Sequence, residues 1–230
     1  MTLAPVAVAL DGPDLATITG WAAAAGPYVS TMKVGLETYL RDGDAAVHAA
    51  RDASGGRDVF LDLKLHDIPN TVGGAARSVA HLAPTYLTVH ASGGAAMVRA
   101  AADALPDTRV TAVTVLTSMS EDDLAAVGLL GPAIDAARRL ALLAVGAGAR
   151  AIVCSPQEVA AIRAEVPRDV VLITPGVRPA GAALGDQQRV ATPEQALADG
   201  ADLLVIGRPI TGAPDVAAAA AQIAASLTIR

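Results

Sequence analysis

The segment 58–71, DVFLDLKLHDIPNT, carries the residues best suited to chemistry. It begins as an apolar strand and then sets two carboxylates, an ammonium and an imidazole among apolar residues: Asp62, Asp67, Lys64 and His66. Side chains alternate between the two faces of a strand, so Asp62 and Lys64 share one face. An ammonium fixed beside a carboxylate can stabilise developing negative charge and then deliver a proton.

Lysine is scarce elsewhere in the chain. Of its 17 basic residues, only Lys33 and Lys64 are lysines. A surface that needs positive charge accepts arginine or lysine, whereas a site that needs a compact ammonium able to give up a proton requires lysine. A coding bias that spared two lysines by chance is the alternative. The place of Lys64 in the charged strand favours the functional interpretation.

The elements that must position these residues follow a regular alternation. Eight short β-like runs alternate with stretches of helical spacing rich in Ala, Leu, Arg and Glu, without a linker. This pattern predicts one α/β domain over residues 1–230, a (β/α)8 TIM barrel. An open doubly wound sheet is the alternative, and the count of eight favours the barrel. The strands are expected at 6–11, 30–35, 58–65, 86–91, 110–118, 149–155, 170–177 and 201–207.

Active sites of such barrels lie at the carboxyl ends of the strands. Those ends carry Asp11, Lys33, Asp62, Lys64, His90, Thr117, Ser118, Cys154, Thr174, Gly207 and Arg208. Isolated buried charges are costly, so the mouth is expected to interleave opposite charges in an array of Asp11, Lys33, Asp62 and Lys64. Such an array suits electrostatic catalysis, and a purely structural ion-pair network is the alternative. Cys154 is expected to be a small core residue.

Two segments suit an anion. After the eighth strand, Gly207 permits close backbone approach and Arg208 offers a planar fork to phosphate, at the usual phosphate site of this barrel class. The long Gly/Ala/Pro-rich segment 174–193 contains Arg178 and Gln187 and is predicted to be a lid over the anion. An inert surface loop is the alternative for that segment.

The residues in the loop after the third strand are expected to have other roles. Asp67 lies beyond the strand, so alternation no longer fixes its direction. Pro69 terminates strand pairing, and Asn70 or Thr71 can cap the next helix, with contact to a ligand as the alternative for Asn70. A general-acid role is open to His66, but we favour one in holding the backbone of the loop.

Composition excludes several classes of function. The net charge is −6, the pI is about 5.1 and aromatic residues make up 2%, which argues against a nucleic-acid surface. The apolar runs are too short to span a bilayer, and the start of the chain does not resemble a signal peptide. Cys154 is the only cysteine, so a reduced, cytoplasmic setting is expected. Hydrolase triads and structural zinc lack their motifs.

The run Asp62 to Thr71 closely resembles the D-x-K-x-x-D-I-P-N-T signature of the orotidine 5′-phosphate decarboxylase family. Leu65 departs from it, since the family commonly has an aromatic residue there. Further segments stand in the family's order: ALD at 9–11, KVG at 33–35, TVHASGG at 88–94, VTVLTS at 113–118, TPGVRP at 174–179, GDQQR at 185–189 and VIGRPI at 205–210.

The resemblance implies a homodimeric barrel, without cofactor or metal, that converts orotidine 5′-phosphate to UMP and carbon dioxide in the last step of pyrimidine synthesis. It makes Lys64 the proton donor, with Asp62 against the substrate carboxylate. Asp67 would reach the partner's site, with Ile68 and Thr71. Asp11 and Lys33 would contact the ribose. The remaining substrate contacts would be Thr117, Ser118, Ser120 and Pro175, and for the phosphate Arg178, Gln187, Gly207 and Arg208.

Two rival functions remain open. A magnesium-dependent sugar-phosphate aldolase or decarboxylase of the same superfamily would share the D-x-K-x-x-D core. The run from His66 to Thr71 and the Gln187 segment argue against it. A phospho-ligand-binding barrel without turnover is expected to have lost a catalytic charge, and here Asp62, Lys64 and Asp67 are all present.

Overall fold

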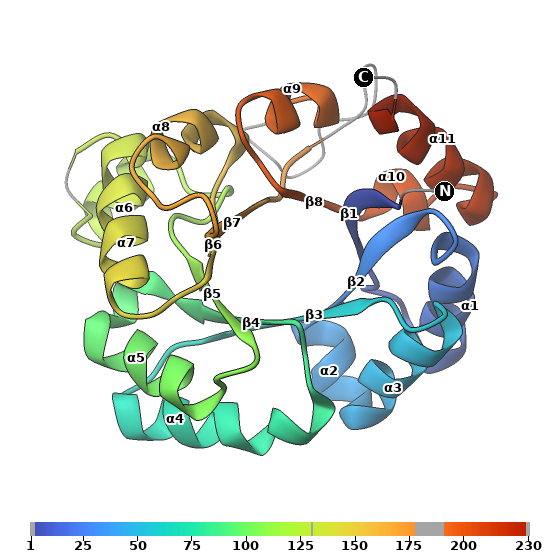
Figure 1. The fold of residues 1–230 in the computed structure, drawn as a ribbon, viewed down its shortest axis with the longest axis horizontal. Coiled ribbons are helices and arrows are strands. Elements are labelled where there is room, and N and C mark those ends of the chain that lie inside the picture. The colour runs from blue at the N-terminus through green and yellow to red at the C-terminus, as the bar shows by residue number, and fades with distance from the viewer. Residues whose placement is uncertain (1–2, 130, 178–190, 229–230) are drawn as a thin grey trace.

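The computed structural model describes residues 3–129, 131–177 and 191–228. Among these residues, eight parallel strands stand side by side in chain order, and the last pairs with the first to close a barrel (Figure 1). The predicted (β/α)8 TIM barrel is confirmed, and the open doubly wound sheet is wrong. The strands are β1 (Ala4–Ala9), β2 (Val29–Gly35), β3 (Asp58–Leu65), β4 (Tyr86–His90), β5 (Arg109–Val113), β6 (Ala151–Val153), β7 (Val171–Thr174) and β8 (Leu203–Ile206).

Helices surround the barrel on all sides (Figure 1). They are α1 (Leu15–Ala25), α2 (Leu36–Asp42), α3 (Asp44–Ala53), α4 (Pro69–Ser78), α5 (Ala95–Ala104), α6 (Glu121–Ala126), α7 (Ala133–Gly146), α8 (Val159–Arg163), α9 (Pro193–Ala198), α10 (Arg208–Thr211) and α11 (Val216–Thr228). Single turns of 3-10 helix lie at η1 (Ala80–Leu82), η2 (Ala91–Gly93) and η3 (Pro156–Glu158). None of the described helices is long and apolar enough to cross a membrane.

Two local predictions are corrected. The N-cap of α4 is Ile68, without a side-chain cap bond, so neither Asn70 nor Thr71 caps this helix. The helix begins at Pro69, whose fixed φ suits the first helical position, so Asn70 and Thr71 already lie inside the first turn. The strand expected at 110–118 ends at Val113, and the residues that follow form a loop at the barrel mouth.

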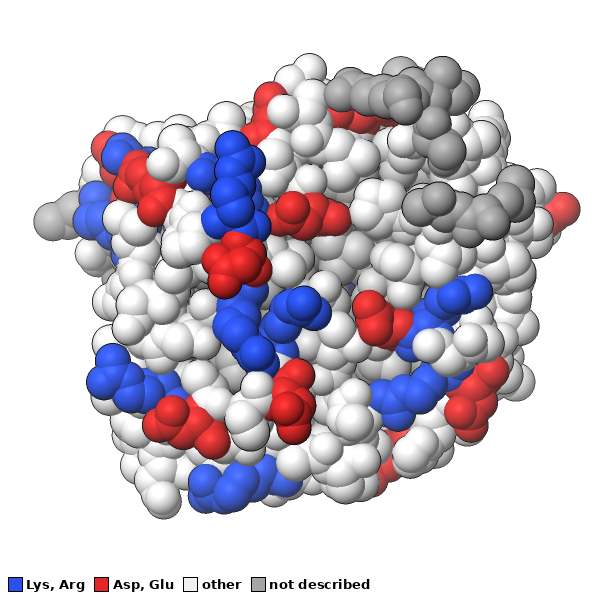
Figure 2. Space-filling model, in the orientation of Figure 1, with Lys and Arg blue, Asp and Glu red and all other residues white. Residues whose placement is uncertain are grey.

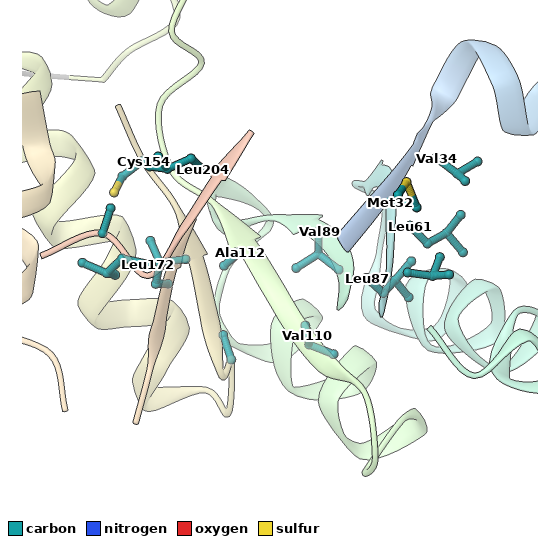
Figure 3. Packing of buried hydrophobic residues seen from close by; sticks show 14 of the residues in the cluster. Met32, Val34, Leu61, Leu87, Val89, Val110, Ala112, Cys154, Leu172 and Leu204 are labelled. Carbon is teal, nitrogen blue, oxygen red and sulfur yellow. The ribbon is translucent and has the colours of Figure 1, made fainter. Parts of the chain in front are cut away.

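The apolar core has two layers. Outward-facing strand residues pack against the helices, among them Met32, Leu61, Leu87 and Leu172 (Figure 3). Cys154 is fully buried in this outer layer, as predicted, and burial raises the pKa of its thiol. Inward-facing residues fill the barrel itself: Ala7, Phe60, Tyr86, Ala151, Ile173 and Leu203. These packed side chains fill the interior of the barrel below its mouth.

Charges on the face drawn in Figure 2 are mixed. Blue and red side chains lie beside one another among its described residues, rather than gathering into a single broad basic area.

Candidate active site

Four charged side chains form a row at the mouth of the barrel. The Nζ atom of Lys33, on β2, lies 3.5 Å from Asp11 Oδ2 and 3.4 Å from Asp62 Oδ2. The Nζ atom of Lys64 lies 2.8 Å from the same oxygen of Asp62. The alternating array expected from strand parity is therefore present, with Asp62 between two ammonium groups.

Burial and charge act against each other at the centre of this row. Burial alone raises the pKa of Asp62, but the ammonium groups of Lys33 and Lys64 outweigh it and hold that pKa below its ordinary value. Burial likewise favours a neutral Lys33, but the carboxylates of Asp62 and Asp11 raise the pKa of Lys33 above its ordinary value. Each central group therefore stays ionised because of its neighbours.

Thr88 on β4 completes the arrangement. Its hydroxyl donates to Asp62 Oδ1 at 3.0 Å and accepts from the backbone N–H of Lys64 at 2.7 Å. One buried hydroxyl thus orients the carboxylate and fixes the backbone of the lysine. Our sequence reasoning missed this residue, although strand parity places Thr88 on the same inward face as Tyr86.

The backbone of Lys64 is in the left-handed region, with φ of +48°. The pairing of β3 with β4 shifts register between Leu61 and Leu65, and Leu65 then pairs with Val89. A left-handed conformation costs about 1–2 kcal/mol in a residue other than glycine, and such strain gathers at functional sites. This register shift changes the direction of the backbone at the end of β3. The hydrogen bond from the N–H of Lys64 to Thr88 holds the backbone in that conformation.

Gly35, at the end of β2, leaves room for the row. A Cβ atom built at this position would overlap Asp11 Oδ1 and lie 3.0 Å from Lys33 Nζ. Any larger residue would therefore push apart the two ions that it faces.

A cavity of about 210 Å³ opens beside the row. Lys33, Asp62 and Lys64 form its charged side. The rest of its lining is largely apolar and consists of Phe60, Val113, Val115, Leu116, Thr117, Val153, Pro175 and Val205. A flat organic group could lie against the apolar side with one atom toward the ammonium of Lys64. Apolar surroundings strengthen electrostatic interactions with such an atom.

The other predicted residues are distributed unevenly. Thr117 and Pro175 line the cavity, whereas Ser118 is exposed nearby and does not line it. Ser120 caps α6, where its hydroxyl accepts from the N–H of Asp123. Gly207 is the N-cap of α10 and the exposed Arg208 is its first residue, directly after β8.

Two predicted residues, Arg178 and Gln187, lie outside the described residues. The predicted lid 174–193 is therefore described only at its ends, where an isolated parallel bridge joins Val177 and Ala191. Among the described residues, no group of three or more His, Cys, Asp or Glu side chains could hold a metal ion.

Asp67, Ile68 and Thr71 are exposed and do not line the cavity. Among the residues that the structure describes, the carboxylate of Asp67 accepts only a local bond, from the N–H of Ile68 at 2.6 Å. Within one chain, these three residues are therefore not brought to the site that Lys64 serves.

Comparisons with known proteins agree over almost the whole length. The family model described as "Orotidine 5'-phosphate decarboxylase / HUMPS family" matches residues 4–223. A protein of Thermobifida fusca (strain YX), named orotidine 5′-phosphate decarboxylase, is 71% identical over 226 residues, covering 97% of this chain and 96% of its own. A protein of Anaeromyxobacter sp. (strain K), with the same name, is 60% identical over 223 residues, covering 96% of this chain and 97% of its own length.

A solved structure is also similar. The crystal structure of orotidine 5′-phosphate decarboxylase from Lactobacillus acidophilus superposes with a TM-score of 0.83 at 34% identity. The superposition covers 98% of this chain and 99% of that one. The two relatives and this solved structure thus carry one name, and it is one of the two in the description of the family model.

Proposed function

Because the chain belongs to the orotidine 5′-phosphate decarboxylase / HUMPS family, we propose that it converts orotidine 5′-phosphate to UMP and carbon dioxide. The observation that carries this proposal is the ammonium of Lys64, 2.8 Å from Asp62 and on the charged side of a largely apolar cavity. The two relatives described above are named after the enzyme that catalyses this reaction.

The geometry suits the difficult step. When the bond between C6 and the carboxylate breaks, its electron pair stays on C6. A fixed ammonium beside that carbon stabilises the pair and then transfers one proton to it, which leaves UMP and a neutral lysine. An arginine could not easily release the proton. Lys64 is therefore assigned as proton donor, and Asp62, Lys33 and Thr88 keep its side chain and backbone in place.

The remaining substrate contacts are assigned from the family resemblance and from position. Asp11 and Lys33 would bind the ribose, while Thr117, Ser118 and Pro175 would lie near the pyrimidine. The phosphate would be held by Gly207, Arg208, Arg178 and Gln187. Binding energy from this distant phosphate can be used to assemble the site around the reacting carbon.

We further propose that the active form is a homodimer in which each site receives Asp67 from the other chain, with Ile68 and Thr71. Three large apolar side chains support this because they are exposed beside the mouth: Leu36 and Leu40 on α2 and Ile68, with exposed fractions of 43%, 79% and 64%. The strands that precede them, β2 and β3, are neighbours in the barrel. A second copy covering this edge would bury these side chains and bring its Asp67 toward the row.

The proposed function is tested by incubating the purified protein with orotidine 5′-phosphate and following the ultraviolet absorbance. We expect conversion to UMP, with one carbon dioxide released per substrate, at a rate unchanged by EDTA. Activity that is lost with EDTA and restored by magnesium would favour the sugar-phosphate rival. Tight binding without turnover would instead favour the non-catalytic barrel.

The shared site is tested by mixing two inactive variants, Lys64→Ala and Asp67→Ala, under conditions that let subunits exchange. Half of the dimers should then be mixed, each with one intact site, so about a quarter of wild-type activity should return. The matched control pairs Lys64→Ala with Asp62→Ala. Both changes lie in one chain's own site, so no mixed dimer has an intact site and no activity should return. Recovery in the control, or none in the test pair, would contradict the arrangement.

A further inference from the structure

Two imidazoles meet at the mouth of the barrel beside Lys64. His90 is the half-buried last residue of β4, and the exposed His66 follows directly after β3. Their ring centroids are 5.3 Å apart, with the planes tilted by 35°. Within the described ranges, neither ring makes a hydrogen bond. The contact between the rings themselves therefore joins the end of β3 to the end of β4.

A glycine makes the space in which His66 lies. A Cβ atom built at Gly93, in the turn η2 that follows β4, would lie 3.2 Å from Cδ2 of His66 and would overlap Met97. The ring of His66 thus lies between its partner His90 and the bare backbone of the next turn.

Beyond this pair, the loop has few attachments to the barrel. The backbone of Lys64 is held by Thr88, and Leu65 still pairs with Val89. After His66, the one bond that Asp67 makes within the described part of the chain is its local bond from Ile68, and Ile68 is largely exposed. His66 is therefore the last side chain that anchors the loop before α4 begins.

We propose that the His66–His90 pair positions Asp67 for the neighbouring chain's active site. Both histidines are positioning residues, because neither lines the cavity beside Lys64. This inference rests on the proposed function and on the shared site described there. In this proposal His66, which follows β3, holds the loop in position and does not contact the substrate.

The surroundings of His90 explain why the neutral form matters. Burial, the neighbouring His66 and the ammonium of Lys64 all lower the pKa of His90, against a smaller opposite effect of Asp62. These charged and titratable groups all lie on β3 or the loop after it, while β5 on the other side pairs His90 with the apolar Val113. A proton on His90 would therefore face cations across the contact, and acid should loosen the loop.

The first test compares His66→Ala with His66→Phe at pH 8. Because His66 is exposed, both variants should fold, and thermal unfolding checks this. Misplacement of a reacting group by 1 Å can cost about 100-fold in rate, so we expect kcat/KM to fall about tenfold in His66→Ala. In His66→Phe the aromatic ring is kept, and kcat/KM should return to within about threefold of wild type. The inference is overturned if the alanine variant stays within twofold of wild type, or if phenylalanine rescues nothing.

The second test follows the ratio of kcat/KM in His66→Phe to that in wild type between pH 8 and pH 5. The substrate phosphate titrates near pH 6 in both proteins, so its effect cancels in the ratio. The ratio should rise toward acid pH, because only wild type places two protonatable rings together. A flat ratio overturns the inference. Wild-type turnover is measured in the same assay, so its absence would instead count against the proposed function.

Discussion

Replacing Lys64 with alanine is expected to lower kcat for orotidine 5′-phosphate by at least about 10⁴-fold while the protein stays folded. A positioned general acid contributes about 10²–10⁴-fold, and a fixed charge donor at a reacting centre about 10²–10³-fold. Alanine removes both contributions. Lys64 is not part of the apolar core, so its loss should leave the barrel intact. The measurement is single-turnover decay of substrate absorbance, with circular dichroism to confirm the fold.

Lys64→Arg is the matched control for this change. Arginine keeps a positive charge beside Asp62 but does not release its proton at neutral pH. The kcat of Lys64→Arg should therefore remain at least about 10²-fold below that of wild type. This remaining loss is the contribution of proton transfer. Turnover of Lys64→Ala above a hundredth of wild type would contradict the assignment of Lys64 as proton donor.

The sequence was enough to predict the barrel and much of the row of charges. Eight apolar runs alternate with stretches of helical spacing, and this alternation defines the barrel. It can be seen in the sequence because the spacing of apolar residues in each strand and helix reflects which of its faces is buried. Alternation along β3 put Asp62 and Lys64 on one face, and the strand ends supplied Asp11 and Lys33. These features depend on local periodicity and on a general rule for where such barrels place their sites.

Other features of the site depend on contacts between distant segments, which periodicity does not encode. Thr88 lies beside Asp62 because β4 pairs with β3, and the register shift that follows Leu61 accompanies the positive φ of Lys64. The need for Gly35 becomes visible only when Asp11 lies against it. The role proposed for Asp67 depends on a second chain, since one chain leaves this side chain exposed.

Asp62→Asn tests the centre of the row and should affect both stability and catalysis. Asparagine keeps the size of the side chain and an oxygen for Thr88, but it leaves the buried Lys33 facing Lys64 without the anion between them. Breaking a buried ion pair by removing one partner costs about 3–5 kcal/mol. Lys33 keeps its contact with the half-exposed Asp11, so we expect the lower end, about 3 kcal/mol, in denaturant unfolding at pH 7.

The pH dependence of this loss has a definite sign. The pKa of Asp62 in the folded protein lies below its ordinary value of 3.8, so its carboxylate contributes stability above that pH. This contribution is lost as the pH falls through the folded value. The difference in unfolding free energy between wild type and Asp62→Asn should therefore be largest near neutral pH and shrink toward pH 3. An equal difference at both pH values would contradict the ion-pair explanation.

The catalytic effect of Asp62→Asn separates two roles for the carboxylate. If Asp62 mainly repelled the substrate carboxylate, Asp62→Asn would bind substrate more tightly, while its affinity for UMP, which lacks that group, would not change. If Asp62 mainly orients Lys64, kcat should fall with little change in either affinity. The 2.8 Å contact and the hydrogen bond from Thr88 favour orientation. We therefore expect kcat to fall at least about 10²-fold, and a selective gain in substrate affinity would show that repulsion contributes.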